Sequence, residues 1–144
     1  MRKAYDPALR VLRLTAAEAA APSGRFTDVL KRGLPARAFD EVAKYTKLGR
    51  ARLGAVTRIS SRTIERRIAR KDRFAVDESE RLARVARMYA LAESVLGGKD
   101  AAERWMASRN RALDGARPVE ELVTDLGARE VEDLLGRIRD GIFA

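Results

Sequence analysis

The sequence predicts an all-α protein in which a helix-turn-helix domain is followed by a small helical C-terminal domain. Alanine, leucine, arginine and glutamate dominate the composition, and aromatic residues make up only 6% of the chain, which favours helices. Apolar residues recur at helical spacing along most of the 144 residues. Residues 55–71 have the pattern of a helix end, a tight polar turn and a second helix.

The segments before this turn are expected to include one arm and two helices. In residues 1–24, Leu9, Leu12 and a run of alanines could form a helix that Pro22-Ser23-Gly24 ends, but the segment has few large side chains, so we expect an N-terminal arm. A short helix is predicted over residues 25–32. A second helix is predicted to start at Pro35, whose missing N–H costs nothing at a helix start, and to end before Gly49.

The predicted helix-turn-helix consists of a first helix over residues 51–57 and a second helix after the turn. Ser60 or Ser61 is expected to cap the second helix, because a serine hydroxyl accepts a hydrogen bond from a free backbone N–H. Glu65 is the expected reciprocal partner in a capping box.

Apolar and basic side chains divide this second helix into two faces. Ile59, Ile64 and Ile68 are expected to point inward. Arginine suits guanine edges and phosphates, and hydroxyl groups suit phosphates, so the outward face is typical of a recognition helix in a DNA major groove. An arginine-rich helix with a merely solvated face is the alternative. The candidate DNA-binding residues are Ser61, Arg62, Thr63, Arg66, Arg67, Arg70 and Lys71.

The distribution of charge favours the DNA-binding interpretation. Residues 44–73 contain eleven Lys and Arg against Glu65 and Asp72, a net charge of +9. The whole chain also carries +9, so the remaining residues sum to zero. Confinement of the basic charge to one segment is the electrostatic pattern expected of a nucleic-acid interface.

The longest predicted helix covers residues 77–96, begins with an aspartate cap at Asp77 and stops at Gly97-Gly98. It is expected to connect the basic half to the C-terminal half; a coiled-coil dimer helix is the alternative, but the apolar pattern is short for one. The later elements are a helix from Asp100 that carries Trp105, a helix over residues 119–126 that Gly127 ends, and a last helix over residues 128–140.

The last predicted helix differs from the basic segment in two ways. Gly136 lies inside it and costs about 1 kcal/mol relative to alanine, which a close approach by another backbone, in this chain or a partner, would explain. Residues 115–144 contain seven acids and four arginines, a net charge of −3. This region is therefore expected to bind a different partner from the basic segment.

Several classes of function are excluded or disfavoured by composition. The chain contains no cysteine and no histidine, which excludes disulfides, thiolate zinc sites, cysteine nucleophiles and histidine bases. No pair of acids is placed convincingly for catalysis, so we expect no enzyme, no metal and no cofactor. No apolar run approaches the roughly 20 residues of a membrane span, and no signal peptide is evident, so a cytoplasmic protein is expected.

An ordered series of residues marks the C-terminal region: Trp105, Asn110-x-x-Leu113-x-Gly115-x-x-Pro118, Leu122, Thr124, Gly127 and Val131-x-x-Leu134-Leu135-Gly136-Arg137-Ile138-x-x-Gly141. This series resembles the C-terminal toxin-binding domain of the Xre/MbcA/ParS antitoxins. The preceding segment, with residues 61–67 and the helix through Leu82, Tyr89 and Leu96-Gly97, is similar to the Xre-type helix-turn-helix of the same antitoxins. The resemblance covers about residues 25–144 and implies an Xre-like domain at 25–98 and a toxin-binding domain at 99–144, whereas the expected arm at 1–24 has no counterpart in it.

The resemblance also implies a type II toxin–antitoxin system whose toxin is a RES-domain protein that consumes NAD⁺. The antitoxin would block the toxin's active-site cleft with its C-terminal segment and repress its own operon through the helix-turn-helix. The expected partners are the cognate RES-domain toxin, operator DNA and a second copy of the chain. The implied toxin-binding residues are Leu134, Arg137, Ile138, Gly141, Ile142, Phe143 and Ala144.

The charge and the apolar residues of the C-terminal segment also favour a role in blocking the cleft of a toxin. A cleft for an anionic dinucleotide should be basic, and an acidic region with a terminal carboxylate can occupy it. Ile142 and Phe143 would supply apolar anchors. Two alternatives stay open: a last helix that only packs on its own core, and a stand-alone DNA-binding regulator whose C-terminal half only dimerises.

Overall fold

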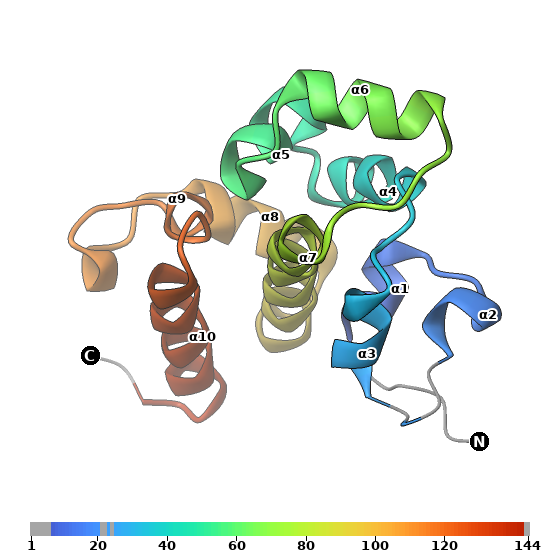
Figure 1. Ribbon diagram of the computed structural model, residues 1–144. Helices are drawn as coiled ribbons and strands as arrows, with labels where there is room; N and C mark the ends of the chain where they lie inside the picture. The colour runs from blue at the N-terminus through green and yellow to red at the C-terminus, as the bar shows by residue number, and fades with distance from the viewer. Residues whose placement is uncertain (1–6, 21–22, 24, 143–144) are drawn as a thin grey trace. The chain divides into compact units, whose positions relative to one another are not determined.

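The computed structural model describes residues 7–20, 23 and 25–142. Its regular structure is helical, and no extended strand occurs within these ranges, which confirms the all-α prediction (Figure 1). The elements are α1 (Ala8–Leu12), α2 (Ala16–Ala19), α3 (Phe26–Lys31), α4 (Arg37–Thr46), α5 (Gly49–Thr57), α6 (Ser61–Ala69), α7 (Val76–Leu96), α8 (Lys99–Ala107), the 3-10 helix η1 (Arg111–Leu113), α9 (Pro118–Glu121) and α10 (Asp125–Arg139).

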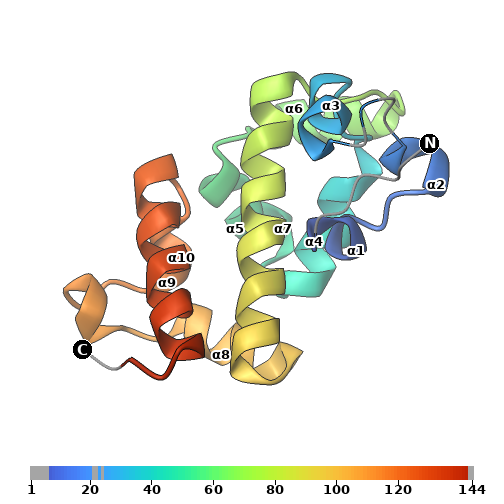
Figure 2. The ribbon, with the colours of Figure 1, turned by 90° about the horizontal axis from the view of Figure 1, so that it is seen from below.

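The chain forms two compact units that divide inside α7. Unit 1 extends to Arg87 and unit 2 begins at Met88, whereas the Gly97-Gly98 pair suggested a boundary at the end of this helix. Figure 2 shows α7 along its length as one continuous helix. Although α7 has 21 residues, no helix in the described ranges combines the length and the apolar composition needed to cross a bilayer.

The N-terminal region is folded over its described residues, which differs from the expected arm. Ala8, Val11 and Leu12 are buried, and α1 packs on α4. The guanidinium of Arg37 in α4 donates to the carbonyl oxygen of Arg13 at 3.0 Å. The sequence allowed a helix in this segment, but its burial was not predictable because it depends on tertiary contact with α4. The remaining arm positions, 1–6, 21–22 and 24, lie outside the described residues.

Three hydrogen bonds, here called the clasp, join Gly33 and Leu34, before α4, to Arg73, Phe74 and Ser79, after α6. The backbone N–H of Phe74 donates to the Leu34 carbonyl at 2.9 Å, and a guanidinium nitrogen of Arg73 donates to the Gly33 carbonyl at 2.8 Å. The buried hydroxyl of Ser79 accepts the backbone N–H of Leu34 at 2.9 Å. These bonds connect positions about forty residues apart in sequence and close unit 1 around its core.

The core of unit 1 contains side chains from every helix of the predicted helix-turn-helix. Phe39 of α4 and Phe74 are both buried, with ring centroids 6.1 Å apart. Leu53 of α5, Ile64 of α6 and Leu82 of α7 are also essentially inaccessible to solvent. The basic helix α6 is thereby attached to a packed scaffold through one apolar face.

Unit 2 is built from the last turns of α7 and from α8, η1, α9 and α10. Met106, Leu122, Val131 and Leu135 are fully buried in it, and Trp105 is half-buried. The loop before α9 is closed by Asn110, whose side-chain oxygen accepts the Ala112 N–H at 3.0 Å. Its backbone carbonyl accepts the N–H of Gly115 at 2.9 Å.

The predicted helix over residues 119–126, ended by Gly127, is wrong. Helix α9 stops at Glu121, and α10 begins at Asp125 with Thr124 as its N-cap. The Thr124 hydroxyl accepts the Gly127 N–H at 2.9 Å, so Gly127 lies in the first turn of α10. A Cβ atom at position 127 would lie 2.2 Å from the Glu121 carbonyl oxygen. Glycine is present because two backbones meet there, not because a helix ends.

Candidate nucleic-acid interface and protein-binding surface

The turn between α5 and α6 is tight and closely packed. Arg58 ends α5 in the left-handed conformation, with φ +56°, and the N–H of Ile59 donates back to the Gly54 carbonyl at 3.1 Å. A Cβ atom on Gly54 would meet the Ile59 carbonyl oxygen at 3.1 Å and the Ile64 Cδ1 at 3.4 Å. Glycine therefore permits the first turn of α6 to pack against α5.

Ser60 is the cap of the second helix, which confirms one of the two predicted positions. Its hydroxyl accepts the backbone N–H of Thr63 at 3.1 Å and lies 3.0 Å from the Thr63 hydroxyl. The predicted capping box with Glu65 is wrong, because the third residue after a Ser60 cap is Thr63. Glu65 lies further along α6 and is exposed.

The C-terminal end of α6 has the hydrogen bonds of a Schellman motif. The N–H of Asp72 donates to the Arg67 carbonyl at 2.9 Å, and the N–H of Lys71 donates to the Ile68 carbonyl at 3.1 Å. Lys71 has φ +54°, a left-handed conformation that glycine usually supplies. Its positive charge lies where the helix dipole favours a cation.

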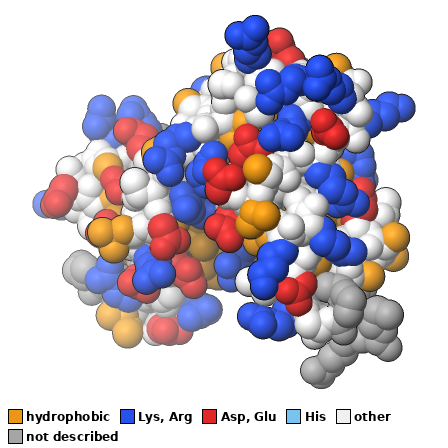
Figure 3. Space-filling view, viewed as in Figure 1, with side chains coloured by type: hydrophobic (Ala, Val, Ile, Leu, Met, Phe, Trp, Pro, Cys, Tyr) orange, Lys and Arg blue, Asp and Glu red, His pale blue; other side chains and the backbone are white. Residues whose placement is uncertain are grey.

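The exposed face of α6 is basic, as the sequence predicted. Ile64 is only 1% exposed and Ile59 is buried, whereas Ile68 is half-buried at the edge of this contact. Helix α6 lies at the outer side of unit 1 in Figure 1, and Lys and Arg side chains gather over it in Figure 3. The exposed residues of α6 and its following turn are Ser61, Arg62, Glu65, Arg66, Ala69, Arg70 and Lys71.

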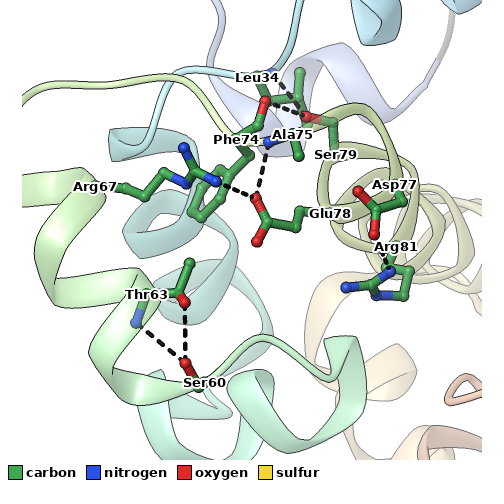
Figure 4. Close-up of polar contacts among 10 residues, drawn as sticks. All are labelled: Leu34, Ser60, Thr63, Arg67, Phe74, Ala75, Asp77, Glu78, Ser79 and Arg81. Atoms are coloured by element: carbon green, nitrogen blue, oxygen red, sulfur yellow. Dashed lines mark hydrogen bonds and ion pairs between the residues drawn. The ribbon is translucent and has the colours of Figure 1, made fainter.

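Arg67 differs from its basic neighbours, and its predicted outward placement is wrong. Its side chain is 23% exposed, and its Nη2 donates to Glu78 Oε1 at 3.0 Å. The same carboxylate oxygen accepts the backbone N–H of Ala75 at 2.8 Å (Figure 4). The Nε of Arg67 is buried and has no hydrogen-bond partner in the described part of the chain. Arg67 therefore connects α6 to the start of α7.

Glu78 is the residue that sequence reasoning missed. Helix α7 was expected to be capped by Asp77, but Asp77 lies inside the helix and pairs with Arg81 at 3.1 Å. That hydrogen bond from Arg81 holds the pKa of Asp77 below its ordinary value. Glu78 instead reaches back to the N–H of Ala75, the helix-side half of a capping box. Alanine at position 75 lacks the hydroxyl of a capping-box residue, so no sequence pattern marked Glu78.

One further cation of the basic segment is paired with an acid. Arg50 donates from Nε and Nη2 to the two carboxylate oxygens of Asp40, each at 2.8 Å. This bidentate contact holds the pKa of Asp40 below its ordinary value of 3.8. Arg50 and Arg67 are thus partly neutralised within unit 1, and the cations of α6 that remain on the exposed face are Arg62, Arg66, Arg70 and Lys71.

In unit 2 the predicted toxin-binding residues have different exposures. Leu134 is buried in the core and Ile138 is half-buried, so Leu134 packs α10 against its own unit. Arg137, Gly141 and Ile142 are exposed, and Ile142 retains 59% of its accessible surface. The other two predicted positions, Phe143 and Ala144, lie outside the described residues.

Gly136 lies in an open groove rather than under another backbone. The only atom within 4 Å of a Cβ built at this position is Arg139 Nη2, at 3.7 Å, so the close approach expected there does not come from the described part of this chain. The groove has a volume of about 650 Å³. Its lining residues are Leu91, Ala112, Leu113, Glu130, Glu132, Asp133, Gly136, Arg137, Arg139 and Asp140.

The described ranges contain no cluster of three or more acidic side chains placed to hold a metal ion. The two features described above are a basic helix on a helix-turn-helix scaffold in unit 1 and, in unit 2, a groove lined by four acids and two arginines among its ten residues. Together they define a helix-turn-helix protein that carries an additional helical unit.

Comparison with known proteins identifies the family. The family model of the antitoxin Xre-like helix-turn-helix domain matches residues 26–87, and that of the antitoxin Xre/MbcA/ParS C-terminal toxin-binding domain matches residues 91–141. The chain is 35% identical to an Antitoxin Xre from Photorhabdus laumondii over 81% of this chain and 79% of that protein. It is also 35% identical to an Antitoxin Xre from Yersinia enterocolitica, over 85% and 86% of the two chains.

A third relative, an Antitoxin Xre from Pseudomonas putida, is 39% identical over 58% of this chain and 52% of its own length. The chain belongs to the Xre family of type II antitoxins, with a helix-turn-helix domain and a toxin-binding domain.

Proposed function

We propose that this antitoxin neutralises a RES-domain, NAD⁺-consuming toxin by blocking its active-site cleft and represses its own operon through α6. The proposal rests on one observation: the basic surface of α6 and the region matched to the toxin-binding domain belong to different units of the chain. The exposed cations of α6 belong to unit 1, and the residues matched to the toxin-binding domain begin at Leu91, in unit 2. Each partner then has its own surface, and the protein acts by binding in the cytoplasm and not by catalysis.

For DNA, the proposed contacts come from α6 and the turn that follows it. Ser61 and Thr63 lie in the first turn, where a hydroxyl group suits a phosphate. Ser61 is exposed, whereas Thr63 is half-buried and its N–H is bonded to Ser60. A single helix contacts only a few base pairs, so the repressing form is proposed to be a homodimer on two half-sites. The proposed cationic contacts are Arg62, Arg66, Arg70 and Lys71.

For the toxin, the proposed contact is the exposed side of α10 together with the residues that follow it. Arg137, Gly141 and Ile142 are exposed there, and Ile138 is half-buried beside them. The groove over Gly136 is lined by four acids and two arginines, which suits the basic rim of a dinucleotide cleft. Phe143 and Ala144 continue this segment in the sequence and belong to the proposal. Leu134 is left out of the contact because it is buried.

A reconstituted assay tests the toxin arm of the proposal. The RES-domain toxin proposed as the partner would be purified, and its NAD⁺ consumption measured while the full-length antitoxin is titrated in. We expect consumption to stop at a stoichiometric ratio. Unchanged NAD⁺ consumption in a complex that forms would contradict blocking of the cleft, and absence of any complex would contradict the choice of toxin.

A selection experiment tests the DNA arm. The full-length protein would be used to enrich duplexes from a randomised pool, and the enriched sequence compared with the region upstream of its gene. We expect a two-fold symmetric site in that region, with half-sites about one helical turn apart. Enrichment of no sequence over the starting pool would contradict operator binding.

A further inference from the structure

We infer that Arg67 and Glu78 form a positioning pair that holds the C-terminal half of α6 against the start of α7, and that Arg67 is not itself a DNA contact. The inference rests on the proposed DNA binding by α6. It assigns a role in DNA recognition to Glu78, an acidic residue outside the recognition helix.

The geometry of the pair supports this role. Glu78 Oε1 accepts two donors, the Arg67 Nη2 at 3.0 Å and the Ala75 N–H at 2.8 Å, so the carboxylate is oriented by the backbone before it meets α6 (Figure 4). The Arg67 and Glu78 side chains are 23% and 16% exposed. A charge-assisted hydrogen bond between part-buried groups is stronger and less screened by salt than one on the open surface.

The two halves of α6 are attached to unit 1 by different contacts. The first turn is fixed by the Ser60 cap and by Ile64, which is 1% exposed and lies near Gly54. The second half has only Ile68 on its apolar side, and Ile68 is half-buried. The Arg67–Glu78 pair adds a side-chain attachment within this half, beside the clasp that holds the residues directly after α6. Arg66 and Arg70 on either side of Arg67 carry the proposed DNA contacts.

Whether Glu78→Gln weakens or tightens DNA binding distinguishes a positioning role of the pair from a general effect of charge. Replacing Glu78 by glutamine removes one negative charge and raises the formal net charge above +9. If only long-range charge mattered, DNA binding would become tighter. If the pair positions α6, specific binding becomes weaker although the protein is more positive.

The first experiment compares Glu78→Gln with a matched control, Glu80→Gln. Glutamine keeps an oxygen that can accept the Ala75 N–H, so the helix start is preserved, while Glu80 is exposed on the same helix and its replacement changes the net charge equally. Affinity would be measured for a duplex selected from a randomised pool by the unaltered protein and for an unrelated duplex of the same length. We expect Glu78→Gln to lose specific affinity by about fivefold or more. Equal or tighter affinity of both variants for the selected duplex would overturn the inference.

The second experiment is a double-mutant cycle. Arg67→Ala should weaken specific binding strongly in the native background and less in the Glu78→Gln background, because glutamine keeps the accepting oxygen but has lost the charge that strengthens the pair. The slope of log affinity against log salt should stay unchanged for Arg67→Ala and fall by about 0.9 for Arg66→Ala, which no longer neutralises a phosphate. Additive effects with a reduced slope for Arg67→Ala would show that Arg67 contacts DNA and would overturn the inference.

Two controls keep the outcome interpretable. Thermal unfolding checks that each variant is folded. If Glu78→Gln unfolds, Arg67→Met, which keeps an apolar stem, replaces it with the salt dependence as the readout: weaker specific binding with an unchanged salt slope supports positioning, and a reduced slope overturns it. Arg67→Lys keeps the charge and a donor and should recover part of the specific affinity. If no duplex is enriched from the pool at all, the proposed DNA binding itself fails, whereas normal enrichment with unchanged affinity of Glu78→Gln overturns the positioning pair alone.

Discussion

The hydroxyl of Ser79 accepts the backbone N–H of Leu34 at 2.9 Å and is fully buried, although the two residues are 45 positions apart in the chain. The same hydroxyl lies 3.5 Å from the Phe74 carbonyl oxygen. One small polar side chain of α7 thus satisfies backbone groups on both segments of the clasp. A buried backbone donor that loses its acceptor is costly, so this serine is a structural requirement of unit 1.

Ser79→Ala is expected to destabilise the folded protein by about 1–3 kcal/mol, because the Leu34 N–H would be left buried without an acceptor. Urea unfolding followed by circular dichroism would measure the loss. Ser94→Ala, at an exposed position of the same helix, is the control and should stay within about 0.5 kcal/mol of the native protein. An equal effect of the two substitutions would contradict the role of the buried bond.

Gly33→Ala is expected to cost more than Gly49→Ala, although both glycines have positive φ, +84° and +75°. A Cβ atom at position 33 would lie 2.3 Å from the Phe74 carbonyl oxygen, whereas nothing lies within 4 Å of one at position 49. We expect about 1–2 kcal/mol of conformational cost at Gly49 and an additional 1–3 kcal/mol, roughly, at Gly33. Chemical denaturation of the two variants gives the difference, and equal stabilities would contradict the close approach.

We expect the triple alanine variant of Arg62, Arg66 and Arg70 to bind any DNA duplex more weakly. The slope of log affinity against log salt concentration should fall by up to about 0.9 for each phosphate that is no longer neutralised. The three residues are exposed, so the unfolding temperature should change little. Fluorescence anisotropy at several salt concentrations would measure both quantities. Arg111→Ala, exposed in unit 2, serves as the charge control and should leave the slope unchanged. A triple variant with the native slope would rule out α6 as the DNA-binding helix.

Gly136→Ala is expected to raise the stability of the free protein and to lower its affinity for the toxin. Alanine is better than glycine inside a helix by about 1 kcal/mol, and no backbone obstructs a Cβ atom at this position, so the free protein should become more stable. If the toxin packs against the groove, an added methyl group should weaken its binding by about tenfold or more. Calorimetry of unfolding and of toxin binding measures the two effects. Unaltered toxin affinity would remove this groove from the proposed toxin-binding surface.

Acid stability is expected to depend on Asp40. Its pKa is lowered in the folded protein by the hydrogen bonds from Arg50, so the pair contributes stability above the ordinary value of 3.8, and this contribution is lost as the pH falls through the lowered value. Asp40→Asn should therefore lower the unfolding temperature at pH 7 and have less effect at pH 2. Thermal scans across this range provide the check. A penalty that stays constant down to pH 2 would contradict the ion pair as its source.

The parts of the fold that sequence could predict are local. The Ser60 cap, the burial of Ile64 and the length of α7 all follow from spacing within one or two helical turns, and the structure confirms them. The basic face of α6 was predictable for the same reason, since it is the side opposite Ile64.

The parts that sequence could not predict depend on residues far apart in the chain or on backbone proximity. Arg67 looks like its basic neighbours in the pattern, and only the fold brings Glu78 to it. The two glycines of α10 look alike as helix interruptions, yet Gly127 faces the Glu121 carbonyl and Gly136 faces an open groove. Helix α1 has only five residues, and its burial comes from packing against α4, which the local sequence does not reveal.

The most direct test of the account is to measure both activities on two variants of the full-length protein. Arg62→Ala/Arg66→Ala is expected to lose the selected DNA duplex and to inhibit NAD⁺ consumption by the toxin as the native protein does. Deletion of residues 142–144 is expected to keep DNA binding and to lose inhibition. Loss of inhibition by the arginine variant while it remains folded, or full inhibition by the truncated protein, would contradict the division between a DNA-binding unit and a toxin-blocking segment.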